Sequence, residues 1–240
     1  MELPRKIDPC PIVDAIIEIR FSTNIHPSAV FGVIYNEFKD KYPTVEKLPI
    51  LDIPEQIREK DINLIFKPYY TLKNGDNLIQ VGPRVLSINQ PDIYKGWENY
   101  SATIYEVLGE VKKLNIIKSI NRLGIRYTNF FRGIDIFEKI NLKILFGDNK
   151  LLGGPTFIRI ELPDEDFSNL LQIANKANYS KKDKTSVIGS IIDIDTVLDK
   201  NLNSFFRDTK KIIEKGHLIE KKLFFELLKP AFLKTLNPIY

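Results

Sequence analysis

The residue types that most often bind metals or act as nucleophiles are scarce in this chain. Its 240 residues include two histidines, His26 and His217, which lie far apart, and a single cysteine, Cys10. Zinc sites need a set of nitrogen, sulfur or carboxylate ligands at short spacings, and the sequence offers no such set. Phosphate-binding loops, dinucleotide-binding fingerprints and nucleophile elbows are also missing. We therefore expect no metal and no cofactor, and we expect the histidines to cap helices or to lie hydrogen-bonded in the core.

Charged side chains, by contrast, gather on three segments whose alternating patterns predict β-strands. In the first of them, Pro11–Phe21, side chains two residues apart lie on the same face, so its charged residues share one face. If the three strands are neighbours in a sheet, one face collects four arginines and two carboxylates. These residues are Arg20, Arg84, Arg122, Arg126, Asp14 and Glu18.

Two functions are open for these arginines. Arginine captures carboxylate or phosphate groups through two parallel hydrogen bonds, which would make the face an anion or nucleic-acid surface. In that case Tyr94, Trp97 or Tyr127 would lie near it as stacking groups for bases.

The alternative is structural. Asp14 and Glu18 would pair with Arg122 and Arg126 across neighbouring strands, as opposite charges often do. We favour this pairing because the carboxylates would neutralise much of the positive field. A third reading, in which the two acids belong to a divalent-metal site of a nuclease, lacks further ligands.

The composition is that of an ordinary globular protein. Hydrophobic residues make up 43% and charged residues 28%, and the net charge of +4 arises from 35 basic residues interleaved with 31 acidic ones. A spread excess of this size predicts, at most, weak and salt-sensitive nucleic-acid binding. No apolar run is long enough to cross a membrane, and the start of the chain lacks a signal-peptide pattern. With one cysteine, the sequence predicts a cytoplasmic protein.

The periodicities predict an α+β fold of two compact halves, each an antiparallel sheet covered by helices. The first half, residues 1–133, should contain about five strands and two helices, and the second, 134–240, about four strands and two helices. In the first half we expect two helices, over Ser28–Asp40 and Trp97–Leu114. We also expect strand-like runs over Asn63–Leu72 and Leu78–Asn89, joined at Asn74-Gly75, and a strand over Asn121–Phe131.

In the second half we expect four strands, over Ile140–Phe146, Thr156–Leu162, Asn169–Tyr179 and Thr185–Val197. A loop should cover Gly147–Pro155, and a hairpin tip should lie at Lys181–Lys184. Two helices follow, one lined by residues 202–213 and one over Leu218–Leu236 that is kinked or stopped near Pro230.

Parts of the sequence resemble an uncharacterised, sporadically distributed prokaryotic family of about this length. The segments that carry the resemblance are Pro11–Phe21 (PIVDAIIEIRF), Val81–Tyr100 (VGPRVLSINQPDIYKGWENY), Arg122–Asn129 (RLGIRYTN) and, more weakly, Gly216–Phe225 (GHLIEKKLFF). That family has no assigned activity, so the resemblance implies no catalytic residues. Its patchy distribution is typical of genes carried by mobile elements or defence islands.

The function that these observations favour is a non-enzymatic binding or regulatory protein that acts through a macromolecular partner, either another protein or a second copy of the chain. The alternative is a nucleic-acid-binding or nucleic-acid-processing component that uses the arginine-lined face. A small-molecule enzyme with an unrecognised site also stays open, because carboxylates, lysines and tyrosines can carry out acid–base chemistry.

Overall fold

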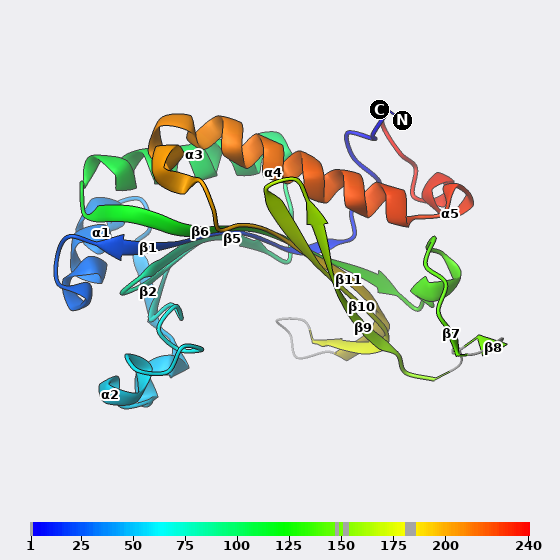
Figure 1. The fold of residues 1–240 in the computed structure, drawn as a ribbon, viewed down its shortest axis with the longest axis horizontal. Helices are drawn as coiled ribbons and strands as arrows, with labels where there is room; N and C mark the ends of the chain where they lie inside the picture. Colours follow the sequence, from blue (N-terminus) through cyan, green and yellow to red (C-terminus); the bar gives the residue numbers. More distant parts are fainter. Residues whose placement is uncertain (1, 147–148, 151–153, 181–185) are drawn as a thin grey trace.

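One nine-stranded antiparallel sheet organises the whole chain (Figure 1). The computed structural model describes residues 2–146, 149–150, 154–180 and 186–240. The strand order is β2-β3-β4-β5-β1-β6-β11-β10-β9. The strands are β1 (Ile12–Thr23), β2 (Thr44–Lys47), β3 (Tyr70–Asn74), β4 (Asn77–Gly82), β5 (Val85–Pro91), β6 (Ile117–Arg132), β9 (Phe157–Asp164), β10 (Phe167–Ser180) and β11 (Ser186–Leu198), and β7 (Leu145–Phe146) pairs with β8 (Asn149–Lys150). The helices are α1 (Val30–Phe38), α2 (Glu55–Arg58), α3 (Trp97–Lys113), α4 (Phe205–Leu227) and α5 (Pro230–Thr235).

The α+β class is confirmed, but the prediction of two separate sheets is wrong. The strand β6, next to the central strand β1, pairs with β1 on one side and with β11 on the other. The sheet therefore joins residues before and after residue 133. Alternation along a strand reveals which face is buried and carries no information about which strand lies beside it. Joining the halves also removes two sheet edges, whose unpaired backbone groups would otherwise need other partners.

The helices α3 and α4 lie on the same face of the sheet (Figure 1). The strand side chains beneath them are apolar and fully enclosed, as at Ile17, Ile125 and Ile194. Helix α4 comes unusually close to β6 at Gly216, where a Cβ atom would lie 2.5 Å from Cδ1 of Ile125. Two clusters of buried apolar residues result, and both sit on this helix-covered face.

Several predicted elements are confirmed. The helix expected over Trp97–Leu114 is α3, and Asn74-Gly75 lies at the tight connection between β3 and β4. The strand expected over Asn63–Leu72 is shorter than predicted, because β3 begins only at Tyr70. Pro27 begins a short 3-10 turn ahead of α1, as its fixed φ favours. The chain also stops its long helix before Pro230, which becomes the first residue of α5.

Other predicted elements were wrong in extent. The run Leu78–Asn89 is two strands, because Pro83 and Arg84 form a turn between β4 and β5. Of the strand expected over Ile140–Phe146, only Leu145–Phe146 forms. The break expected between the two closing helices near residues 213–218 is absent, because α4 continues through Ile213 and Gly216 to Leu227. Its one non-helical residue is Asp208, and the short helix α5 follows from Pro230.

The expected hairpin tip at Lys181–Lys184 and most of the loop over Gly147–Pro155 lie outside the described residues. Among the helices that the structure describes, none has the length and apolar character needed to cross a membrane.

Candidate functional site

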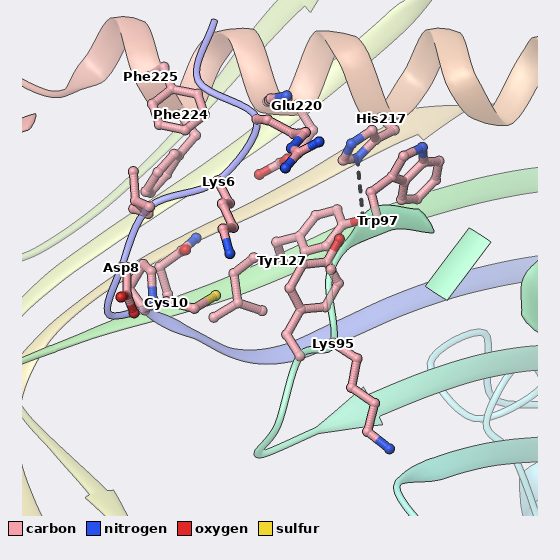
Figure 2. A pocket seen from close by; sticks show the side chains of 18 of the residues that line it. Lys6, Asp8, Cys10, Lys95, Trp97, Tyr127, His217, Glu220, Phe224 and Phe225 are labelled. Carbon is pink, nitrogen blue, oxygen red and sulfur yellow. Dashed lines mark hydrogen bonds between the residues drawn. The ribbon is translucent and has the colours of Figure 1, made fainter. Parts of the chain in front are cut away.

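A cleft of about 590 Å³ opens at the side of the molecule where the chain begins, between α4 and the N-terminal segment (Figure 2). Its volume is in the range of small-molecule sites. Four parts of the chain line it: the segment from Arg5 to Ile12, the residues Tyr94–Glu98 that lead into α3, the end of β6 with Tyr127 and Asn129, and the α4 residues His217, Glu220, Lys221, Phe224 and Phe225.

The N-terminal wall is fastened to the end of the chain. The backbone N–H of Arg5 donates to the carbonyl of Ile239 at 2.6 Å, and the N–H of Ile239 donates to the carbonyl of Lys6 at 2.8 Å. Next along, the N–H of Asp8 donates to the carbonyl of Leu236 at 2.9 Å. The side chain of Ile7 is buried with the apolar cluster near α5. These contacts hold the segment in place as a wall of the cleft.

The aromatic side of the cleft is fixed by α4. The indole ring of Trp97 stacks on the imidazole of His217 with centroids 3.7 Å apart and an angle of 8°. One turn earlier on α4, Glu214 accepts hydrogen bonds from Trp97 Nε1 at 3.0 Å and from the Tyr105 hydroxyl at 2.8 Å. The Tyr127 hydroxyl lies 3.2 Å from His217 Nδ1 (dashed in Figure 2). The two rings are therefore held rigidly from both helices and from β6.

These aromatic and imidazole groups are uncharged near neutral pH. Burial lowers the pKa of His217 to about 3, and the nearby Lys221 lowers it further in the same direction. Burial also raises the pKa of Tyr127 well above its ordinary value. A neutral imidazole has one donor and one acceptor nitrogen, so His217 can hydrogen-bond both Tyr127 and a bound molecule.

Glu220 is the exceptional residue of the cleft. It is only 5% exposed, yet it makes no hydrogen bond or ion pair with any other described residue. Burial raises the pKa of Glu220 from 4.5 to about 8; Lys221 opposes the rise and Asp193 adds to it. At neutral pH the side chain is therefore mainly a carboxylic acid, which can donate one hydrogen bond and accept others.

The lining of the cleft carries more positive than negative charge when Glu220 is protonated. Arg5, Lys6 and Lys221 line the cleft, against Asp8 and Glu98. Lys95 also contributes to the lining, but in Figure 2 its side chain points away from the other labelled residues, and its ammonium pairs with Asp76 at 3.0 Å.

The charged residues singled out in the sequence lie on the opposite face of the sheet. Arg122 bridges two carboxylates, with Nη1 2.9 Å from Glu18 and Nη2 2.7 Å from Asp195. Arg20 adds a second contact to Glu18 at 2.8 Å. The predicted pairing of Glu18 with Arg122 is confirmed. We call Arg20, Arg122, Arg126, Glu18, Asp193 and Asp195 the charged sheet face.

Arg126 pairs with an acid that the sequence analysis did not single out. Its Nε and Nη2 atoms lie 2.8 and 2.5 Å from the two oxygens of Asp193, which is 5% exposed. Thr128 and Gln172 also donate to Asp193. Both oxygens of this buried carboxylate therefore accept hydrogen bonds.

Asp14 lies on the same face and is less well satisfied. Its Oδ1 atom is enclosed and has no hydrogen-bond partner in the described structure. Burial raises the pKa of Asp14 to about 6; Arg126 lowers it, whereas Asp193 and Asp92 raise it.

The remaining predicted positions are elsewhere. Arg84 sits in the β4–β5 turn, and the structure ties it to β1 through its backbone carbonyl, which accepts from Phe21 N–H at 3.0 Å. The prediction that Tyr94, Trp97 or Tyr127 would lie near the arginines is wrong, because these rings line the cleft on the helix-covered face. The exposed His26 contacts Ser28 next to it at 2.8 Å.

Sequence reasoning missed Glu220, although one signal was available. In α4 the buried positions Ile213, Gly216, Glu220 and Phe224 follow helical spacing. A glutamate inside an otherwise apolar stripe is a buried acid that needs a reason. No group of three or more side chains suited to a metal ion occurs among the described residues. No family model and no curated protein matches the chain.

Proposed function

We propose that this protein binds a small, negatively charged molecule with a flat ring, and that the molecule occupies the cleft between α4 and the N-terminal segment. The observation that carries the proposal is Glu220, a buried acid without a partner inside a cleft of ligand size. The carboxyl oxygens of Glu220 are not among the fully enclosed unpaired atoms of the described structure, so they open onto the cleft. A ligand that hydrogen-bonds the carboxylic acid would supply the partner that no described residue provides.

The aromatic side chains that line the cleft favour a ligand with a flat ring. The cleft surface next to Glu220 consists of aromatic side chains, with Phe224 and Phe225 on one side and Tyr94, Tyr127 and Trp97 on the other. Aromatic rings pack well against other rings in stacked or edge-on arrangements, at about 0.5–1.5 kcal/mol beyond the area they bury. The fixed stack of Trp97 on His217 offers such a surface without further ordering.

The charges that line the cleft favour a negatively charged ligand. With Glu220 protonated, Arg5, Lys6 and Lys221 outnumber Asp8 and Glu98 in the lining. Charges arranged in this way raise the local concentration of an anion and speed its entry, with a dependence on salt. Lys221 is the most suitable contact because it is partly buried and follows Glu220 directly.

The proposal keeps a binding role but replaces the expected macromolecular partner with a small molecule. It places the site in the cleft rather than at the arginines, which belonged to the nucleic-acid alternative. Cys10 is exposed, but partial desolvation by its surroundings raises the pKa of its thiol, which disfavours a thiolate nucleophile. A base with the lowered pKa of His217 is also a weak proton acceptor near neutral pH. Both observations favour binding over catalysis.

The test is a thermal-shift and calorimetry screen with aromatic carboxylates, indole carboxylates and nucleoside monophosphates at about 1 mM each, because a ligand that binds only the folded state raises its melting temperature. Glu220→Leu fills the same buried space without a polar group. We expect at least about tenfold weaker binding, the equivalent of one lost hydrogen bond, together with unchanged or higher stability.

Lys221→Ala and Lys222→Ala form a matched pair, because Lys221 lines the cleft and its exposed neighbour Lys222 does not. Only the first should weaken binding. The proposal is wrong if no compound in the screen raises the melting temperature, or if Glu220→Leu binds as tightly as the unchanged protein.

A further inference from the structure

The two edge strands of the sheet differ in how well they are protected. Edge strand β2 has four residues and lies between Pro43 and Pro49, which end it on both sides. The other edge, β9, has eight residues; Pro155 lies two residues before it, and its only internal proline is Pro163, next to its last residue. Long edge strands expose a row of unpaired backbone groups that can pair with another strand. In the described structure β9 has a neighbour, β10, on one side only.

The pairing of β9 with β10 decides which backbone groups point outward. The two strands are joined by the two-residue turn Glu165-Asp166, so Asp164 and Phe167 form the first hydrogen-bonded pair. Hydrogen-bonded and non-hydrogen-bonded pairs alternate along an antiparallel ladder. The next even-numbered position follows this order: the carbonyl of Thr156, directly before β9, accepts a hydrogen bond from the N–H of Asn175 in β10 at 3.1 Å. Even-numbered residues therefore bond β10, and Phe157, Arg159 and Glu161 present their N–H and C=O groups outward.

We propose that β9 pairs antiparallel with β9 of a second copy of this chain, around a two-fold axis at Ile160. In this register Arg159 of each copy faces Glu161 of the other, and both residues present outward-directed backbone groups to each other. Phe157, which is 65% exposed, faces Pro163 of the other copy, whose carbonyl can still accept a hydrogen bond. The same strand is thereby complementary to itself, as a two-fold interface requires.

Charge selects this register over its neighbours. A slip by two residues would place Arg159 against Arg159 or Glu161 against Glu161, and like charges directly opposite are destabilising. A slip by one residue would set outward-directed groups against residues whose groups already bond β10. Arg159 and Glu161 are both exposed and make no ion pair with the described residues, so both are available for the second copy.

The other face of β9 supports the same arrangement. Ile158, Ile160 and Leu162 alternate with the charged residues and are partly buried on the helix-covered face. Ile158 and Leu162 pack against the apolar cluster beneath α4, whereas Ile160 lies between them. In the dimer Ile160 meets Ile160 of the second copy, so the apolar layer becomes continuous across the interface.

The first test is charge exchange, read by light scattering after size exclusion at about 50 μM, a concentration at which a moderately strong dimer is populated. We expect a dimer for the unchanged chain and monomers for Arg159→Glu and for Glu161→Arg. Mixing the two variants should restore a dimer, because every facing pair is then opposite in charge. The double variant Arg159→Glu/Glu161→Arg should dimerise by itself, and the exposed control Arg207→Glu should remain a dimer.

The second test fixes the register in a Cys10→Ser background. Ile160→Cys should form a disulfide between copies, because Cα atoms of a non-hydrogen-bonded pair lie about 4.5 Å apart, within reach of the bond. Ile158→Cys should cross-link with Leu162→Cys when the two are mixed, and neither should cross-link alone. A monomeric unchanged chain, or a dimer that survives both single charge reversals, overturns the proposal. These outcomes are independent of ligand binding in the cleft.

Discussion

Two buried acids on opposite faces of the sheet, Asp193 and Glu220, differ in how many donors they meet. On the charged sheet face, Asp193 is 5% exposed and receives donors from three side chains. On the helix-covered face, Glu220 is equally buried and receives none from the described residues. The first carboxylate has its partners within the protein, and for the second we propose a partner that binds in the cleft. Burial alone therefore does not say whether an acid has its hydrogen-bond partners within the protein.

Donors around a carboxylate favour its ionised form because they replace the water that it has lost. Glu220 lacks such donors, and its raised pKa shows that it meets burial by keeping its proton. A buried charge whose partner is removed costs more than an unpaired neutral acid. The two sites should accordingly respond very differently to mutation.

The largest effect is expected at Arg126. Replacing it with alanine removes two of the donors to Asp193 and leaves that charge buried, so Arg126→Ala should lower the free energy of unfolding by about 2–3 kcal/mol. The value is below that of a fully enclosed pair because the Arg126 side chain is 44% exposed. Urea denaturation at pH 7 measures it, with the exposed Arg207→Ala as control. A change below about 0.5 kcal/mol, the usual range for surface substitutions, would contradict this account of the charged sheet face.

A smaller, pH-dependent effect is expected at Glu220. The unfolded side chain ionises near 4.5 and the folded one near 8, so between these values the folded state binds more protons. Stability must then fall as the pH rises through this window, and the loss is complete above pH 8. From pH 6.5 to 8 we expect the unchanged protein to lose about 1–2 kcal/mol, and Glu220→Gln to lose almost none.

The chosen range isolates Glu220 from the other titrating groups. The lowered pKa of His217 gives the opposite sign, since its stabilisation is lost as the pH falls below about 6.5. Asp14, with a pKa of about 6, titrates mostly below the range. Glu226→Gln, an exposed position on the same helix, is the matched control. Equal slopes for Glu220→Gln and the unchanged protein would show that Glu220 is ionised in the fold.

Local sequence patterns predicted much of this architecture, but they could not predict which distant segments pair with each other. The alternation in β1 and β6 correctly separated the apolar residues from Glu18, Arg20, Arg122 and Arg126, because side chains two residues apart share a face. Asp193 and Asp195 complete the charged sheet face from a strand more than sixty residues further along. No local spacing could have linked them to the arginines.

Gly124 illustrates the same limit. It sits opposite Glu18 in the ladder, and a Cβ atom there would lie 2.7 Å from Nη1 of Arg122. The glycine leaves room for the guanidinium to cross the strand toward Glu18. From the sequence alone, a glycine in a strand indicates a bulge or a close approach, without saying what approaches. The cleft was missed for a related reason, since its walls come from four parts of the chain that only the fold brings together.

The smallest effect is expected for nucleic-acid binding at the charged sheet face. Arg20, Arg122 and Arg126 each lie within 2.9 Å of a carboxylate, so little of their charge is available to phosphates. Fluorescence anisotropy with labelled single-stranded and duplex oligonucleotides should show at most weak binding, with a Kd above about 10 μM at 150 mM salt and a steep loss of affinity between low and physiological salt.

The same measurement on Arg126→Ala completes the comparison between the two faces. If Asp193 is the true partner of Arg126, the variant should lose stability and change the weak affinity less than about threefold, because one phosphate contact at most is removed. Tight binding that survives physiological salt, and that disappears in an Arg126→Ala protein of normal melting temperature, would reverse the assignment. The arginines would then belong to a binding surface, and their carboxylate contacts would be those of a resting state that nucleic acid displaces.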